Sequence, residues 1–428
     1  MEMKKYKLGE LMDVTRGQSL SGEYYSKSGN LVRLTLGNFD YHNNCFKDDK
    51  SKDNLYFTGS VKKEFILKKD DIITPLTEQA IGLLGSTAKI PCSGKYIQSQ
   101  DVALIKCNKK LNPDFAFYLI PSKIVRNQLS AAAQQTKIRH TSPDKIKDCS
   151  VWVPEYSEQE KIGKLLSRID NKIAINRQIN RNLEELAKQI YDYWFLQFDF
   201  PNEDGKPYKS SGGKMVWNDV LKRDIPAGWN CFEMQNICNI SRGASPRPIE
   251  AYMDTTNTGI PWIKISDATE DIESPYLLKI KDCIIPEGKE KSVSVKPDTL
   301  IVSNSATPGI PKFVELNACV HDGWLILDKY DSYYKYYLFY VIKMVRYNLL
   351  YLASGSIFKN LKTDYLKTLP TLVPDIKILQ RFDEKIERIM KHILKTEREI
   401  NELIELRDNI LPLLMNGQVT LNSCLSHD

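Results

Sequence analysis

The sequence predicts an α+β protein in which two mixed α/β domains stand in pseudo-two-fold relation, separated by two long helices that form an antiparallel intramolecular coiled coil. Three observations predict this fold. The chain contains two diverged copies of a unit of roughly 220 residues. Each copy begins with short apolar runs broken by glycine, proline, asparagine and aspartate. Each copy ends in nearly 40 residues with apolar side chains at helical spacing.

The duplication is visible as segments that recur in the same order. Leu8–Gly17 recurs as Met234–Gly243, at a shift of 226 residues, with the same apolar spacing and a final Arg-Gly pair. Small changes in the shift are what loop insertions produce, so the sequence indicates a true repeat. Further pairs are Val32–Leu34 with Ile263–Ile265, Asp70–Thr74 with Asp298–Val302, and Val153-Pro154 with Val373-Pro374.

The repeat suggests a division of the chain into four parts. We predict the first mixed domain at residues 1–156 and the first long helix at 157–200. A linker and the second mixed domain follow at 201–373, and the second long helix with a tail occupies 374–428. Turn-forming residues between the apolar runs of both domains are typical of short strands joined by loops.

The two long helices carry the clearest periodic signal. Charged residues fill the positions between apolar ones, which is the pattern of a coiled-coil seam, and each helix would be about 60 Å long. A seam of that length needs a partner, and the repeat supplies one in the same chain. Two unrelated core helices, or an intermolecular coil, are the alternatives. The seam residues are Ile162, Leu165, Ile169, Ile173, Ile179, Leu183, Leu186, Ile190 and Trp194 in the first helix, and Ile376, Leu379, Phe382, Ile386, Ile389, Ile393, Ile400, Leu403 and Ile410 in the second.

Charge is concentrated at the start of the chain. The net charge is +6 over 428 residues, of which residues 1–156 carry +7, 157–200 carry 0, 201–373 carry +1 and 374–428 carry −2. A basic domain suits a polyanion, since lysine and arginine neutralise phosphates and release counterions. The nearly neutral second domain shows that electrostatics alone does not make this argument.

Several functional classes lack their sequence signals. The chain has no apolar run of about 18 residues and no apolar N-terminal leader, so we expect a cytoplasmic protein with no membrane partner. Nine cysteines without a CxxC pair predict reduced thiols and neither a disulfide framework nor a zinc site. Neither a methyltransferase tetrapeptide nor a phosphate-binding loop occurs, so no cofactor is expected in this chain. His321-Asp322 could serve acid–base chemistry, but a structural histidine is the favoured interpretation.

Specific segments give the chain a family resemblance over essentially its whole length. The most distinctive are YDYWFLQFDFP at Tyr191–Pro201, KMVWNDVLKRDIPAGW at Lys214–Trp229, and the stretch Ser241–Ile263. The ends of the two copies, Val153–Glu160 and Leu411–Leu421, add further landmarks. Together these segments resemble the DNA-specificity subunits of type I restriction–modification enzymes. The first domain departs most from the family, because no proline follows its Arg-Gly turn.

The resemblance implies a non-catalytic protein that reads a bipartite double-stranded DNA target. Two target recognition domains would each read one half-site, and the paired helices would set the gap between the half-sites. Four residues added between Ile179 and Leu186 would lengthen the coil by about 6 Å, or about two base pairs. Such a subunit joins two modification subunits, to which restriction subunits can be added. S-adenosylmethionine, and ATP with Mg²⁺, are implied for those partners only.

Polar residues on loops between short strands are the natural candidates for DNA contact. Arg16 and Arg242, like Arg139 and Lys359, occupy matched places in the two copies, which favours phosphate contact over base reading. Gln135 has no counterpart of its type and is a better specificity candidate. The alternative for each residue is a solvated loop side chain. The candidates are Arg16, Gln18, Asn38, Thr77, Gln79, Gln134, Gln135, Lys137 and Arg139 in the first domain, and Arg242, Ser245, Arg247, Lys264, Asn304, Ser305, Thr307, Ser356 and Lys359 in the second.

Two other functional classes remain open from the sequence. A self-contained methyltransferase or nuclease is disfavoured by the missing motifs, and a methyl-transfer assay on the purified chain would test it. A coiled-coil scaffold that binds only proteins is the other alternative. A gel-shift experiment with a modification subunit present would distinguish a scaffold from a DNA reader.

Overall fold

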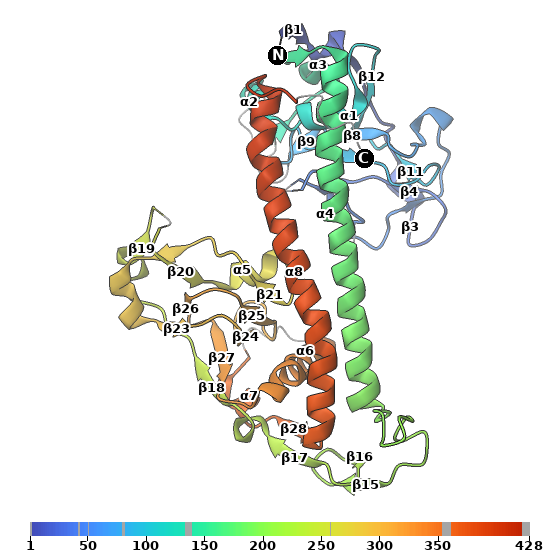
Figure 1. Cartoon of the computed structure of the whole chain (residues 1–428). Helices are drawn as coiled ribbons and strands as arrows, with labels where there is room; N and C mark the ends of the chain where they lie inside the picture. Colours follow the sequence, from blue (N-terminus) through green and yellow to red (C-terminus); the bar gives the residue numbers. More distant parts are fainter. Residues whose placement is uncertain are drawn as a thin grey trace. The chain divides into compact units, whose positions relative to one another are not determined.

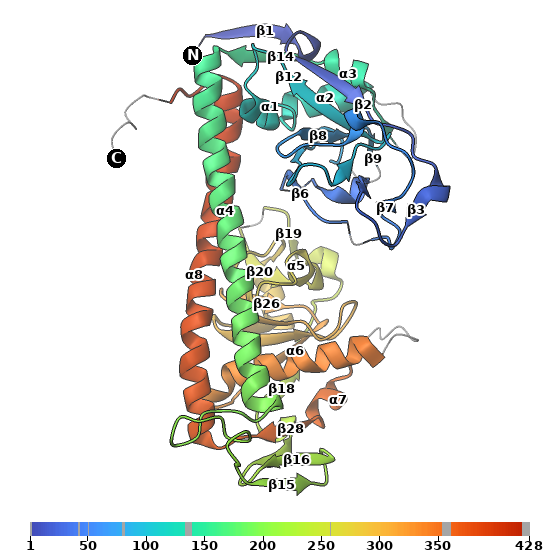
Figure 2. The same cartoon turned by 90° about the vertical axis from the view of Figure 1, so that its right-hand side faces the viewer.

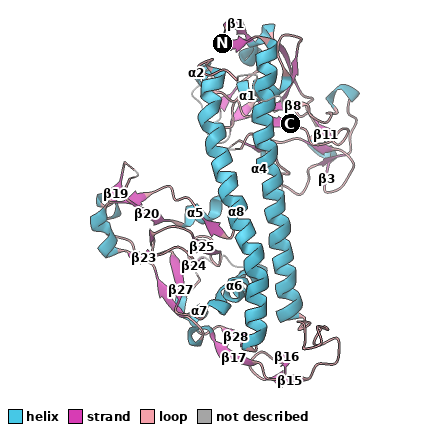
Figure 3. Cartoon of the chain, viewed as in Figure 1, coloured by secondary structure: helices cyan, strands magenta, loops and turns pink. Residues whose placement is uncertain are grey.

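The structure, a computed structural model, forms two compact units. Unit 1 comprises Met1–Ile173 and Glu402–Asp428, and unit 2 comprises Ala174–Asn401. Strands and helices are mixed in both (Figures 1 and 3). Each unit takes part of both long helices, whereas the division drawn from the sequence is linear along the chain and stays a prediction. The structure describes residues 2–41, 43–49, 51–78, 82–132, 139–256, 258–352 and 361–421.

The two predicted long helices are α4 (Tyr156–Tyr191), which continues into a π-helical turn, and α8 (Ile376–Met415). Within unit 2, Asn176 Nδ2 donates to Glu399 at 2.9 Å and Asn180 Nδ2 donates to Glu397 at 2.8 Å. Residue numbers rise along α4 as they fall along α8, so the helices are antiparallel there (Figure 1). The predicted antiparallel pairing within one chain is confirmed for this unit.

The seam of the coil differs in detail from the predicted one. Ile179 and Leu186, two predicted seam residues, are 36% and 46% exposed. Asn176 and Asn180 are buried in the seam instead, at 2% and 6% exposed. The asparagine Nδ2 groups donate to glutamates of α8, which offsets part of the cost of burying them, while Asn180 Oδ1 has no hydrogen-bond partner among the described residues. Apolar spacing alone could not reveal a polar layer of this kind.

Among its described residues, the mixed domain of unit 1 contains two four-stranded sheets and three short helices. The first sheet has the order β10-β8-β12-β2 and the second β11-β4-β7-β3, while β1 pairs with β14. The main strands are β1 (Met3–Lys7), β2 (Met12–Arg16), β3 (Tyr25–Ser26), β4 (Val32–Arg33), β7 (Tyr56–Phe57), β8 (Ile72–Pro75), β10 (Ala88–Lys89), β11 (Tyr96–Ile97), β12 (Val102–Cys107) and β14 (Ser150–Pro154). Two short pairs are β5 (Phe39–Asp40) with β6 (Cys45–Phe46), and β9 (Thr77–Glu78) with β13 (Arg139–His140). The helices are α1 (Pro113–Leu119), α2 (Lys123–Ala132) and α3 (Pro143–Lys147).

The mixed domain of unit 2 contains two five-stranded sheets in the part that the structure describes. Their orders are β18-β27-β24-β25-β21 and β19-β22-β20-β26-β23; β17 pairs with β28, and β15 forms a hairpin with β16. The strands are β15 (Met215–Asn218), β16 (Arg223–Pro226), β17 (Asn230–Glu233), β18 (Asn239–Arg242), β19 (Met253–Asp254), β20 (Ile260–Ile263), β21 (Tyr276–Leu277), β22 (Cys283–Ile284), β23 (Val293–Val295), β24 (Thr299–Ser303), β25 (Pro311–Val314), β26 (Ala318–Val320), β27 (Trp324–Asp328) and β28 (Pro370–Val373). The helices are α5 (Ile265–Glu270), α6 (Lys335–Leu352) and α7 (Thr363–Lys367).

The two domains have equivalent strand pairings. The order β8-β12-β2 in unit 1 corresponds to β24-β27-β18 in unit 2, and the parallel pair β4 and β11 corresponds to β20 and β26. One sequence match needs correction. The Thr35 N–H is capped by Asn38 as the Lys264 N–H is capped by Asp267, so Lys264 corresponds to Thr35 and not to Arg33. The pairing of residues in the structure is therefore shifted by two positions from the pairing that the sequence alignment gave.

Each mixed domain shares its hydrophobic core with the long helices. In unit 2, Tyr191 and Phe195 at the end of α4 pack with Phe382 of α8 and with Tyr337 of α6. Helix α6 lies against α4 in this unit, where Lys343 pairs with Glu184 (Figure 2). The aromatic segment singled out in the sequence is therefore core. No helix in the described ranges is long and apolar enough to cross a membrane.

In unit 1 the contact between helix and domain depends on a glycine. A Cβ built on Gly163 of α4 would lie 2.8 Å from both the Asp114 Cβ and the Phe115 nitrogen of α1. The helices approach so closely there that no side chain fits.

We expect Gly163→Ala to lower the melting temperature of the chain. Alanine normally stabilises a helix relative to glycine by about 1 kcal/mol. Any loss of stability in this variant therefore comes from the clash with α1, which we expect to cost about 1–3 kcal/mol. Thermal unfolding followed by circular dichroism measures the effect. Arg168→Ala, at an exposed position of the same helix, is the control. Equal melting of Gly163→Ala and the parent would show that α1 and α4 do not pack this closely.

A buried carboxylate on α8 gives a second expectation. Burial raises the pKa of Asp383 from 3.8 to about 6, aided by the charge of Glu387. Between these two values the folded chain holds more protons than the unfolded chain, so the free energy of unfolding falls as pH rises through this window. Asp383→Asn should therefore raise the melting temperature at about pH 7.5 but not at about pH 4. Glu402→Gln, which removes an exposed carboxylate from α8 that does not act on Asp383, should show no such pH-dependent gain.

Candidate nucleic-acid interface

In unit 2 a tight turn after β26 lies against the end of β18. A Cβ on Gly243 would lie 2.3 Å from the His321 carbonyl oxygen, so only glycine allows this approach. Arg242, the last residue of β18, donates its Nε to the carbonyl oxygen of Asp322 at 2.7 Å. The main chain of the turn therefore fixes the direction of the arginine, whose guanidinium reaches the surface.

The same arrangement occurs in unit 1. A Cβ on Gly17 would lie 2.3 Å from the carbonyl oxygens of Gln98 and Ser99, and Arg16 donates its Nε to the carbonyl oxygen of Gln100 at 2.7 Å. Arg16 is exposed, as Arg242 is. The two arginines are therefore equivalent in the fold as well as in the sequence. Their assignment to phosphates stays a prediction.

The carboxylate of Asp322 lies close to three polar side chains of the second domain. Its Oδ1 accepts a hydrogen bond from Ser245 Oγ at 2.8 Å. The Nη2 atoms of Arg247 and Arg242 lie 3.6 and 3.9 Å from its Oδ2. Burial raises the pKa of Asp322, but the Ser245 hydrogen bond and the nearby positive charges outweigh it, so the pKa is lowered and the carboxylate is ionised. Three predicted contact residues thus surround one anion.

His321 supports this turn from within. Its Nδ1 accepts a hydrogen bond from the Gly323 N–H at 2.8 Å, which leaves the ring proton on Nε2, 3.2 Å from Asp322 Oδ1. Burial lowers the pKa of His321, so the imidazole is neutral near neutral pH. Its ring lies 5.3 Å from that of Trp262. These contacts support the structural interpretation of His321.

Three of the other described candidates of unit 2, Lys264, Asn304 and Ser305, lie around the same turn. Lys264 Nζ pairs with Asp282 at 2.7 Å and lies 5.3 Å above the Trp262 ring. Asn304 is 6% exposed and donates its N–H to the Gly323 carbonyl. Ser305 and Thr307 lie between β24 and β25, and a Cβ on Gly323 would be 2.7 Å from Ser305 Oγ. Arg242, Ser245, Arg247, Asn304 and Ser305 are therefore brought together around residues 320–323.

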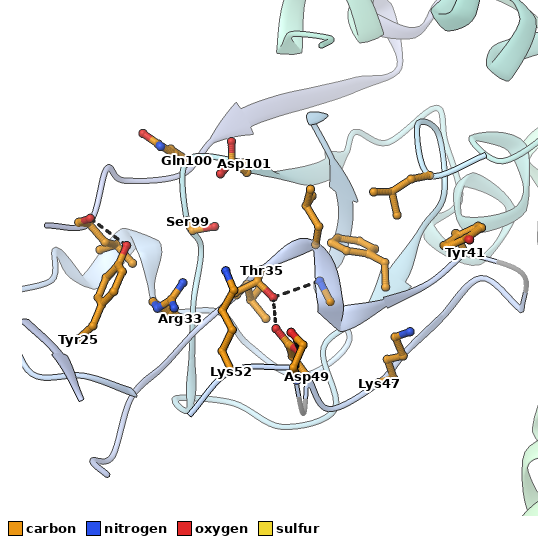
Figure 4. Close-up of a pocket in the computed structure, with 17 residues that line it drawn as sticks. Tyr25, Arg33, Thr35, Tyr41, Lys47, Asp49, Lys52, Ser99, Gln100 and Asp101 are labelled. Carbon is orange, nitrogen blue, oxygen red and sulfur yellow. Dashed lines mark hydrogen bonds between the residues drawn. The ribbon is translucent and has the colours of Figure 1, made fainter. Parts of the chain in front are cut away.

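In unit 1 a cavity of about 340 Å³ adjoins the turn that orients Arg16 (Figure 4). Ser99 and Gln100 of the turn line it, as do Arg33, Lys47 and Lys52. The Arg33 guanidinium lies 3.9 Å from the centre of the Tyr25 ring. The cavity thus combines cations with polar groups at the edge of the domain.

The side chain of Asp49 also lines this cavity. Thr35 donates its hydroxyl to Asp49, which also accepts from the hydroxyl and N–H of Ser51. Burial raises the pKa of Asp49, but these hydrogen bonds outweigh burial and lower it. Asp49 therefore stays charged and orders the loop that carries Lys47 and Lys52.

The structure places the remaining candidates of unit 1 in different environments. Gln18 is half-buried and donates to the Ser60 carbonyl at 3.4 Å. Asn38 and Thr77 are 2% and 7% exposed, and Asn38 uses its amide on the backbone of Thr35 and Lys47, which favours a structural role. Arg139 pairs with Glu78 at 3.6 Å. Gln79, Gln134, Gln135, Lys137, Ser356 and Lys359 lie outside the described residues, and with them the comparison of Gln135 with Gly355.

Sequence reasoning missed several residues of these sites. Asp322 was considered only as a partner of His321, and Arg33, Asp49 and Trp262 were not singled out as contacts. Only the adjacency of His321 and Asp322 offered a signal. Among the described residues, no group of three or more His, Cys, Asp or Glu side chains could hold a metal ion, and the described cysteines are free thiols.

Comparison with known proteins shows the family to which this chain is similar. Residues 1–185 and 226–406 each match the family described as the type I restriction modification DNA specificity domain. The MjaIX specificity subunit of Methanocaldococcus jannaschii is 23% identical, over 72% of this chain and 69% of that protein. The HindI specificity subunit of Haemophilus influenzae is 22% identical, over 98% of this chain and 100% of its own length. The crystal structure of the type I restriction–modification S subunit from M. genitalium has the same fold, with a TM-score of 0.59 at 15% identity, over 97% of this chain and 96% of that one.

The two family matches and the equivalent strand pairings of the two domains place the chain among DNA-specificity proteins. The chain belongs to the type I restriction modification DNA specificity family, and it carries the family's domain twice.

Arg247 gives a direct test of the second interface. Its side chain is 82% exposed, so Arg247→Ala should leave the melting temperature unchanged. Loss of one arginine–base or arginine–phosphate contact should weaken binding of the second half-site by roughly five- to a hundredfold, measured by competition with DNA altered in one half-site at a time. Arg388→Ala, an exposed arginine on α8, is the control. Equal losses at both half-sites would contradict the assignment.

Proposed function

We propose that this chain reads a split DNA target within a type I restriction–modification complex, with one half-site for each recognition domain. The proposal rests on an Arg-Gly pair that packs against a turn in the same way in both domains: Arg16 with Gly17, and Arg242 with Gly243. In both domains an exposed guanidinium is directed by a backbone carbonyl at the same distance, 2.7 Å. Each device stands on a domain that shares its core with a different stretch of the same two helices.

The coil would set the gap between the half-sites. Asn176 and Asn180 donate to α8 at fixed positions, which opposes sliding of one helix along the other. In coiled coils a single buried polar residue is enough to specify register. The pseudo-two-fold relation of the two domains remains part of the proposal.

The chemistry would come from partner subunits. Two modification subunits would supply adenine methylation with S-adenosylmethionine, and restriction subunits, where present, would add ATP- and Mg²⁺-dependent cleavage. This chain would assemble those subunits in the cytoplasm and choose the DNA sequence on which they act.

Electrophoretic mobility shift with the purified chain and its modification subunit tests the proposal. We expect tight binding only to DNA that carries both half-sites, identified by mapping methylated adenines in cells with and without the gene. Binding to the subunit without any sequence preference for DNA would instead support a protein-only scaffold. Methyl transfer by the chain alone would contradict the non-catalytic assignment.

The role of the coil in spacing yields a separate prediction. Seven residues inserted into both α4 and α8, at the facing positions Asn180 and Glu397, keep the seam in phase and lengthen the coil by about 10 Å. The preferred gap should grow by about three base pairs, because base pairs rise about 3.4 Å each. Methylome mapping reads the gap directly. Insertion into α4 alone, which breaks the pairing, is the matched control. An unchanged gap between the half-sites in the double insertion would refute the idea that the coil sets this gap.

A further inference from the structure

Asp322 is the main chemical difference between the two equivalent turns. The carbonyl that orients Arg242 belongs to Asp322, and the carbonyl that orients Arg16 belongs to Gln100. The same place in the fold therefore carries an anion in the second domain and a neutral amide in the first.

The two oxygens of Asp322 have different partners. Oδ1 accepts the Ser245 hydroxyl at 2.8 Å and lies 3.2 Å from His321 Nε2. Oδ2 lies 3.6 and 3.9 Å from the Nη2 atoms of Arg247 and Arg242, beyond hydrogen-bond distance. Within the described part of the chain, Oδ2 accepts no hydrogen bond, and the side chain is 30% exposed. One oxygen is thus held by the protein and the other is open to a ligand.

A carboxylate on a DNA-binding face has an electrostatic cost. It cancels part of the positive charge of Arg242 and Arg247 and repels phosphates. Contact with an amino group of a base compensates for this cost. In the major groove, cytosine presents its N4 amino group as a donor, while guanine presents O6 and N7 as acceptors that suit arginine. A carboxylate oxygen flanked by guanidinium groups therefore complements the edge of a C·G pair.

We propose that Asp322 is a specificity-determining residue of the second domain, which accepts a hydrogen bond from a cytosine N4 amino group while Arg247 donates to the paired guanine. The proposal rests on the proposed function. Gln100 cannot form the same charged pair in the first domain, so the preference belongs to the second half-site alone.

The test uses the complete complex with its modification subunits and a panel of targets in which each base pair of the second half-site is changed in turn. Asp322→Asn keeps the shape of the side chain and an oxygen for Ser245, but replaces one acceptor by a donor. We expect the preference for one C·G pair to fall roughly tenfold or more, while the profile of the first half-site is unchanged. Binding to unrelated DNA should become tighter, because a negative charge is removed.

Two further variants sharpen the result. Glu250→Gln removes an exposed carboxylate close to Arg247 in sequence and controls for net charge. The double variant Asp322→Asn with Arg247→Ala should lose no more preference at that base pair than the larger of the single losses, since both residues read the same pair.

The outcomes separate the two proposals. If the parent complex discriminates at both half-sites and Asp322→Asn has the same base profile, the role of Asp322 is refuted while the proposed function stands. An even loss across all base pairs would show that Asp322 only positions the arginines, which also overturns the inference. If the parent complex prefers no half-site, the proposed function itself fails.

Discussion

The need to bury one long apolar seam underlies the whole structure. Helices α4 and α8 each carry apolar side chains over about ten turns. Pairing of the two helices buries one side of each. The recognition domains cover more, since Phe382 and Ile162 belong to cores that also contain domain residues. A domain that shares its core with a helix cannot rotate freely on it. Each domain is therefore held on its stretch of the helices by the same burial that stabilises the coil.

The sequence predicted the features that depend on periodicity. The duplication, the two long helices and their antiparallel pairing needed only apolar spacing and repeated segments. The seam was less accurate: Ile179 and Leu186 are exposed, and the buried positions of α4 near Ile179 are the polar Asn176 and Asn180. Spacing reports which side is apolar, and a polar layer satisfied by distant glutamates gives no local signal.

The site was predicted less fully for a similar reason. Arg16 and Arg242 were found because they end a repeated motif. The convergence on Asp322 was not, because Ser245 and Asp322 are 77 residues apart and meet only through strand pairing. Asn38 was chosen for its polarity, yet it lies inside the domain as a helix cap. Polar character marks a loop residue, but only the fold decides whether it faces solvent.

The Gly17 and Gly243 turns have a consequence for how new specificities arise. In both, the arginine is oriented by a main-chain oxygen, which every amino acid provides. The side chains at those positions can therefore change without disturbing the anchor, and the chain contains two solutions, Ser99-Gln100 and His321-Asp322. Under the proposed function, such a turn keeps the DNA-contacting arginine in place while mutation of the turn's side chains changes the bases that are recognised.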